Sequence, residues 1–99
     1  MLIWRGELMK YVENIVIGKP IVDPCDMFAK NIEDWEKNEK EKTYYTEERF
    51  LPKILVEIGA TKSVNEIRRN RKDLMVTLND LAYMEIKLGK RRLFILVGK

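Results

Sequence analysis

A chain of 99 residues, 45% hydrophobic and 35% charged, has the size and composition of one small domain with a single modest core, so we expect one domain over residues 1–99. No stretch has the roughly 20 apolar residues that a membrane-spanning helix needs. The absence of histidine argues against a zinc site, and a lone Cys25 cannot form an internal disulfide, which is typical of a cytoplasmic protein. We expect no cofactor and no catalytic residues.

The charge is divided unevenly along the chain. Residues 1–50 hold 8 basic and 11 acidic side chains, a net charge of −3, whereas residues 51–99 hold 11 basic and 5 acidic side chains, a net charge of +6. Segregated charge of this kind can present a basic surface to phosphates while the overall charge stays moderate. We therefore divide the domain into an acidic N-terminal helical part, 1–45, and a basic helix-helix-hairpin unit, 46–99.

The acidic part begins with a segment, 2–17, in which helical spacing of apolar residues gives way to the β-branched run Ile15-Val16-Ile17. This predicts a helix fading into a short strand. Asp23 followed by Pro24 predicts an N-cap and the first helical position of the next helix, with Phe28, Ile32 and Trp35 as its apolar stripe. Charges alternate in sign from Glu33 to Lys42, and the pairs Glu33/Lys37 and Glu36/Lys40 indicate a solvated helix end.

The basic unit opens with a helix whose start is signalled by Thr46, Glu47 and Glu48 and whose end is signalled by Gly59. Because proline disrupts a helix interior, either the helix begins at Pro52 or its first turn is a separate piece. Its buried positions recur at helical spacing: Leu51, Ile54, Leu55 and Ile58. Tyr44 and Tyr45, just before it, are expected to pack at the join or, less simply, to stack on bases.

A second helix is predicted to begin at Ser63, because Ser63 and Glu66 have the Ser-x-x-Glu spacing of a capping box. The capping role explains Ser63, the only serine of the chain, without a nucleophilic one. The predicted apolar face leaves Arg68, Arg69 and Lys72 outward, with Arg71 nearer the boundary. Its members are Val64, Ile67, Leu74, Met75 and Leu78.

A hairpin closes the chain. Gly89-Lys90 suits a two-residue turn with the positive φ angle at glycine. The register that follows pairs Leu88 with Arg91, Lys87 with Arg92, Ile86 with Leu93, Glu85 with Phe94 and Met84 with Ile95. One face of the hairpin is then apolar, and the other places Lys87 opposite Arg92, a like-charge pair that costs a few tenths to about 1 kcal/mol.

Because cations at a hairpin tip do not favour folding, we interpret them as part of an anion-binding site. The fold class that these elements predict is α+β, a small single domain with helices packed on a short antiparallel sheet that ends in a C-terminal β-hairpin. The residues expected to contact nucleic acid are Lys62, Arg68, Arg69, Arg71, Lys72, Lys87, Lys90, Arg91 and Arg92.

From about residue 51 onward the chain resembles the S-four type RNA-binding domain, which also forms the C-terminal domain of bacterial tyrosyl-tRNA synthetases. The matching segments are Leu55-Val56-Glu57-Ile58-Gly59, Lys62-Ser63 with Glu66 and Arg68-Arg69, Val76-Thr77-Leu78-Asn79, and Lys87-Leu88-Gly89-Lys90-Arg91-Arg92. The resemblance implies two packed helices on a small sheet that hold structured RNA. It implies phosphate contacts for Lys62, Arg68 and Arg69, and a share of the surface for Lys90, Arg91 and Arg92.

Two other functions remain open. The order helix, capped basic helix and basic hairpin is also that of a winged helix-turn-helix protein, whose second helix enters the DNA major groove. Alternatively, the chain is a structural or assembly protein, for example from a phage or mobile element, whose basic face meets an acidic partner or another copy. Trp4, Phe28 and Trp35 either pack under the basic unit or form the seam of a homodimer.

Overall fold

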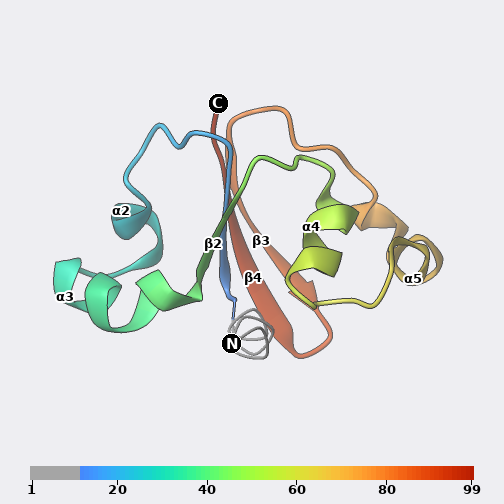
Figure 1. The fold of residues 1–99 in the computed structure, drawn as a ribbon, viewed down its shortest axis with the longest axis horizontal. Coiled ribbons are helices and arrows are strands. Elements are labelled where there is room, and N and C mark those ends of the chain that lie inside the picture. The colour runs from blue at the N-terminus through green and yellow to red at the C-terminus, as the bar shows by residue number, and fades with distance from the viewer. Residues whose placement is uncertain (1–11) are drawn as a thin grey trace, which may run out of the picture.

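A computed structural model describes residues 12–99, and its framework is a four-stranded sheet with helices on both faces (Figure 1). The strands are β1 (Asn14–Ile17), β2 (Thr43–Thr46), β3 (Ala82–Leu88) and β4 (Arg91–Val97). The helices are α2 (Pro24–Phe28), α3 (Ile32–Asp34), the π-helix η1 (Trp35–Glu39), the 3-10 helices η2 (Lys40–Lys42) and η3 (Lys72–Leu74), α4 (Leu51–Glu57) and α5 (Val64–Asn70). Of the helix expected to fade into a short strand over 2–17, the strand is confirmed as β1, and residues 2–11, with Trp4, lie outside the described residues.

The strand order is β2-β1-β4-β3. The α+β class and the C-terminal hairpin are confirmed, and β3 and β4 are antiparallel as expected. The sheet as a whole is mixed, because β1 pairs in parallel with β2 on one side and with β4 on the other. Both halves of the chain therefore contribute strands to the same sheet.

The two helical layers differ in how much they bury. In Figure 1, α4 and α5 lie on one side of the sheet, and α2 and α3 lie on the other. The main core forms under α4 and α5, where the fully buried side chains are Ile15, Ile17, Leu51, Ile54, Leu55, Ile58, Leu93, Ile95 and Val97. Since side chains alternate along a strand, Val16 and Leu96 point to the opposite face, under the layer that contains the buried Cys25 and Trp35.

The thinner layer is built from short pieces. Asp23 caps α2 by accepting a hydrogen bond from the Cys25 N–H at 2.9 Å, and Pro24 occupies its first turn, as predicted. The helix then stops at Ala29, and Asn31 caps a new start by accepting from the Asp34 N–H at 2.8 Å. This break changes the helical phase, so the predicted apolar stripe is wrong at Ile32, whose side chain is 66% exposed. Glu33/Lys37 and Glu36/Lys40 form the expected ion pairs.

Of the alternatives left open for the start of α4, the one at Pro52 agrees with the structure to within one residue. Thr46 ends β2, and the helix begins at Leu51, with Pro52 in the first turn where its missing N–H costs nothing. Glu48 prepares this start, because its Oε2 accepts hydrogen bonds from the N–H groups of Arg49 and Phe50. Gly59, with φ of +74°, ends the helix as expected.

Beyond the carboxyl ends of β1 and β4, backbone hydrogen bonds continue to join the two segments. Lys99 N donates to Lys19 O at 2.7 Å, and Gly98 N donates to Ile17 O at 2.7 Å, which extends the β1–β4 pairing past both strands. The Arg49 guanidinium donates to Leu78 O at 3.0 Å and, from both terminal nitrogens, to Gly98 O at 3.2 and 3.3 Å. In residues 12–99, no helix has the length and apolar content to cross a membrane.

Candidate nucleic-acid interface

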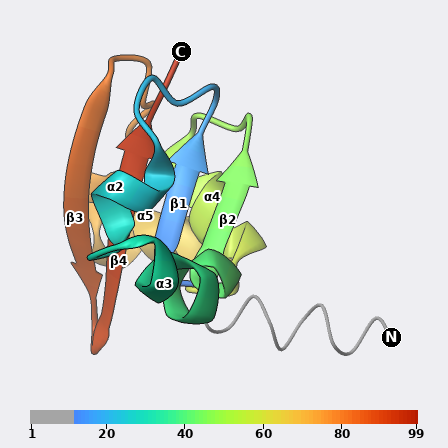
Figure 2. The ribbon, with the colours of Figure 1, turned by 90° about the vertical axis from the view of Figure 1, so that its left-hand side faces the viewer.

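The hairpin has the predicted register. Each expected pair from Met84–Ile95 to Leu88–Arg91 is present, and Gly89 has φ of +66°. Leu93, Ile95 and Val97 are buried in the core under α4 and α5, and Met84 and Ile86 pack against it. Figure 2 shows the turn of the hairpin reaching beyond the end of β1, away from α2 and α3.

Lys87 and Arg92 face one another across the hairpin as expected, and Glu85 supplies a countercharge that the prediction did not include. Arg92 Nε lies 2.6 Å from Glu85 Oε2 in an ion pair between exposed side chains. Glu85 lies on the same face as Lys87 and two residues before it, so Arg92 reaches it diagonally. The carboxylate reduces the local charge and leaves Lys87 as the cation of the pair that has no carboxylate partner among residues 12–99.

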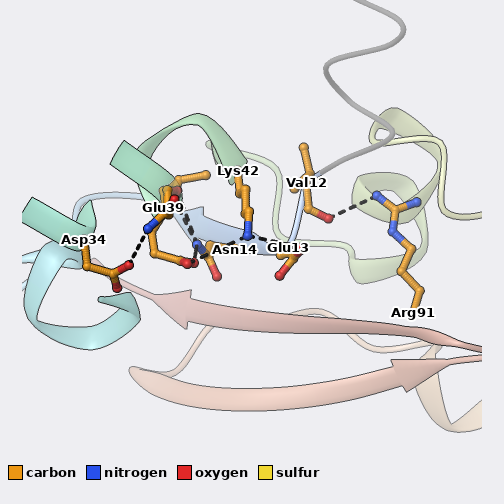
Figure 3. A network of polar contacts seen from close by, with 9 residues as sticks. Val12, Glu13, Asn14, Asp34, Glu39, Lys42 and Arg91 are labelled. Atoms are coloured by element: carbon orange, nitrogen blue, oxygen red, sulfur yellow. Dashed lines mark hydrogen bonds and ion pairs between the residues drawn. The ribbon is translucent and has the colours of Figure 1, made fainter. Parts of the chain in front are cut away.

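Arg91 turns inward and is partly buried. Its guanidinium donates to Val12 O at 3.1 Å, at the start of the segment that leads into β1 (Figure 3). Burial lowers the pKa of Arg91, and the nearby Glu13 carboxylate acts in the opposite direction. The side chain thus connects the hairpin to the neighbouring strand, which is a structural role beside the expected phosphate contact.

Close to this contact, Asn14 is the centre of a polar network on the other face of the sheet (Figure 3). Its side chain is 2% exposed, and Nδ2 lies 3.2 Å from Glu39 Oε1 and 3.3 Å from Thr43 Oγ1. Lys42 Nζ joins Glu13 and Glu39 at 3.6 and 3.9 Å. These contacts attach the π-helix η1 to β1. Each polar side chain named here contacts at least one other member of the network.

Arg71 connects the end of α5 to the hairpin. Its Nη1 donates to Lys87 O at 2.6 Å, while Nε and Nη2 donate to the two carboxylate oxygens of Asp73 at 3.0 Å each. The hydrogen bonds with Asp73 raise the pKa of Arg71, and the pKa of the Asp73 carboxyl is lowered by the same contact. With its nitrogens engaged in this way, Arg71 is held in a fixed orientation against β3.

The N-terminus of α5 is capped by Ser63, whose Oγ accepts from the Glu66 N–H at 3.2 Å. Only this half of the predicted capping box forms, because the Glu66 carboxylate makes no hydrogen bond to any residue of 12–99. The predicted apolar face is wrong beyond Ile67, because α5 ends at Asn70. Ile67 is buried, and Arg68 and Arg69 are exposed on the outer side of the helix. Arg68 donates to Asn65 Oδ1 at 2.7 Å.

The nine predicted residues therefore fall into two groups. Arg71, Arg91 and Arg92 have the partners described above. The remaining six are exposed and have no carboxylate within 4.0 Å among residues 12–99: Lys62, Arg68, Arg69, Lys72, Lys87 and Lys90. They do not form one flat patch, because α5 covers the sheet face opposite to the one on which Lys87 lies, so the two sets flank the edge strand β3.

A small pocket lies where α5 meets the end of β3. It has a volume of about 50 Å³ and is lined by Thr61, Glu66, Ile67, Asn70, Arg71 and Leu88. Asn70 and the free Glu66 carboxylate were not predicted, since a capping box accounted for Glu66. Asp73 and Glu85 were not predicted as partners either, although their spacing from Arg71 and Arg92 could have revealed both.

Within the described part of the chain, no group of three acidic or cysteine side chains converges to hold a metal ion. No protein-family model, curated protein or solved structure matches this chain. The resemblance to the S-four type domain therefore stays a prediction from the quoted motifs.

Proposed function

We propose that this protein binds structured RNA through the exposed cations of α5 and of the hairpin. The observation that carries the proposal is the Arg71 contact with Lys87 O, because it joins the end of α5 to the hairpin beside a set of six exposed cations without carboxylate partners. Cations held apart by a folded scaffold attract phosphates and release the counterions condensed around them. An RNA that passes over the edge of β3 contacts both sets.

RNA is favoured over duplex DNA by the length of α5. Its 7 residues span about 10 Å at a rise of 1.5 Å per residue, and Arg71 ties its end to β3. A recognition helix of a winged helix-turn-helix protein needs free length to enter the major groove. A short helix beside a hairpin suits phosphates that approach from several directions, as in a folded RNA. A cytoplasmic location belongs to the same proposal and fits a chain with a single cysteine.

Assembly with a protein partner, including a second copy, is the other candidate. It is favoured by the outer edge of β3, where Leu81 and Tyr83 are 49% and 44% exposed. An open edge strand with apolar neighbours can add a strand from another chain. The Arg71 guanidinium donates to the Lys87 carbonyl at one end of this edge. This shortens the part of β3 that can pair with a strand from another chain.

The test measures affinity for a hairpin RNA and for duplex DNA of the same sequence over a range of salt concentrations. We expect tighter binding of RNA, with log K falling as log salt rises in proportion to the number of phosphates neutralised. The variant Arg68→Ala/Arg69→Ala removes two exposed cations from α5, and Lys37→Ala/Lys40→Ala makes the same charge change in the opposite layer. The first should flatten the salt dependence by about two phosphate contacts, and the second should leave it close to that of the unsubstituted protein.

The absence of salt-dependent binding to either polymer would contradict the proposal. A concentration-dependent dimer under the same conditions would then support assembly. Equal flattening by the two double variants would indicate a long-range effect of net charge rather than an interface at α5.

A further inference from the structure

The pocket between α5 and the end of β3 combines apolar walls with polar groups that have no partner. Ile67 is 3% exposed and Leu88 is partly buried. Neither the Glu66 carboxylate nor the Asn70 side-chain amide makes a hydrogen bond or ion pair with any residue of 12–99. An apolar pocket with a few converging polar groups is the usual form of a site for a small molecule or for part of a larger one.

The sign of the charge restricts what can enter. Glu66 is partly buried and lies on a helix whose outer side carries Arg68 and Arg69, yet it is within 4.0 Å of neither. A free carboxylate repels a phosphate and accepts hydrogen bonds from N–H groups. Asn70, an exposed residue four positions further along α5, lines the same pocket and adds both a donor and an acceptor. The group that fits carries adjacent N–H donors and one acceptor, and it is part of a molecule whose phosphates are held by the surrounding cations.

We propose that this pocket binds the Watson–Crick edge of one unpaired guanine in the RNA, an inference that rests on the proposed function. Guanine presents two neighbouring donors, N1–H and the N2 amino group, to the Glu66 carboxylate, and its O6 accepts from the Asn70 amide. Adenine offers one donor beside an acceptor that the carboxylate repels. Uracil has a single N–H between two carbonyls, and cytosine has a single amino group beside two acceptors. Unpaired bases are the usual target of sequence-specific recognition of RNA.

The size of the pocket fits a small polar group such as the edge of a base. Its volume of about 50 Å³ is room for a few water-sized groups, at roughly 10–15 Å³ of such volume each. The polar edge of guanine would fill this space, while the rest of the ring stays outside. There the planar guanidinium of Arg71, fixed by Asp73 and by Lys87 O, offers a surface on which a base can stack.

The experiment compares five hairpin RNAs that differ only at one unpaired position, which holds guanine, adenine, cytosine, uracil or hypoxanthine. We expect guanine to bind about tenfold tighter than adenine, the smaller end of the discrimination that a bidentate contact gives. Hypoxanthine lacks the N2 amino group and should fall between them. The variant Glu66→Gln keeps the backbone N–H that Ser63 accepts from, so it should fold, and it should reduce the preference for guanine to about twofold or less.

The results separate this inference from the function on which it rests. Tight, salt-dependent binding with equal affinity for all five RNAs would overturn the guanine site and leave RNA binding in place. Glu66→Gln raising the affinity for every RNA by the same factor would also overturn it, because the carboxylate would then act only as a repelling charge. If no RNA binds with salt dependence, the proposed function and the guanine site fail together. Asn70→Ala is the second variant, and its effect should be confined to RNAs with an O6 group.

Discussion

The two ends of β4 differ in how closely the rest of the chain packs around them. At its carboxyl end, Gly98 is buried, its carbonyl accepts from Arg49, and the following residue pairs with Lys19. At its amino end, Gly89 and Lys90 are exposed, and a Cβ at Gly89 would meet nothing within 4 Å. At the carboxyl end of β4, the Arg49 guanidinium is thus bound by backbone carbonyls. At the amino end, the side chain of Lys90 is exposed to solvent. The first arrangement stabilises the fold, and the second is free to serve binding.

The largest effect that separates the two ends is expected from glycine substitution. A Cβ added at Gly98 would overlap Lys19 O and come within 2.7 Å of Pro20 N, both backbone atoms that cannot move aside freely. Gly98→Ala should lower the free energy of unfolding by about 3 kcal/mol, at the upper end of overpacking. Gly89→Ala has only the positive φ angle to oppose it and should cost about 1 to 2 kcal/mol. Chemical denaturation measures both, and equal costs would contradict the comparison.

A smaller difference is expected between two arginines. Arg49→Ala leaves Gly98 O and Leu78 O without their donor in a partly buried site and should cost about 2 kcal/mol. Arg69→Ala, on the exposed side of α5, should change stability by less than about 0.5 kcal/mol. Thermal unfolding of the two variants gives the comparison, and Arg49→Lys tests whether one donor can replace the guanidinium. A destabilising Arg69→Ala would show that the exposed cations also support the fold.

The stability cost expected for an Arg71 substitution lies between those for Arg49 and Arg69. Arg71→Ala removes the hydrogen bonds to Asp73 and to Lys87 O, and because its side chain is 38% exposed, we expect a cost of about 1 kcal/mol. It should also loosen the junction between α5 and the hairpin and weaken RNA binding more than Lys72→Ala, which removes the same charge from an exposed position next to it. Hydrogen exchange of the β3 amides together with an RNA titration measures both effects. Equal RNA affinities for the two variants would mean that Arg71 contributes only charge.

Local rules predicted the hairpin and failed for the parallel strands, for a physical reason. A two-residue turn fixes the partner of every residue in Met84–Leu88, so Gly89-Lys90 alone determined the register. The pairing of β1 with β2 and β4 joins residues far apart in sequence, and Thr43–Thr46 is too short to show a period of its own. Tyr44 and Tyr45 were therefore expected at a join, whereas Tyr44 packs on the core from within β2.

The same limit applies to the candidate site. Exposure of Arg68 and Arg69 followed from the helical period, and that expectation agrees with the structure. The partners of Arg71 and Arg91 did not follow, because Lys87 O belongs to β3 and Val12 O to the segment that leads into β1, and the positions of both depend on the whole sheet. Charge alone marks a residue as available for a ligand only until the fold supplies another acceptor.

The smallest effect on stability is expected from a fall in pH, and it should arise at Glu48, just beyond the carboxyl end of β2. The backbone N–H of Phe50 is the main cause that holds the pKa of the Glu48 carboxyl below its ordinary value of 4.5. A carboxyl whose pKa is lower in the folded state stabilises the fold above its ordinary value and loses this contribution as the pH falls through the lowered one. Stability should therefore decline below about pH 4.5, and Glu48→Gln, which keeps an acceptor but cannot titrate, should flatten this decline.

The exposed neighbour Glu47 provides the control, since Glu47→Gln should leave the slope unchanged. Urea denaturation between pH 6 and pH 2, a range chosen to bracket the ordinary carboxyl values, gives the slopes. An unaltered decline in Glu48→Gln would assign the acid sensitivity to the other carboxyls with lowered pKa values, Asp34 and Asp73.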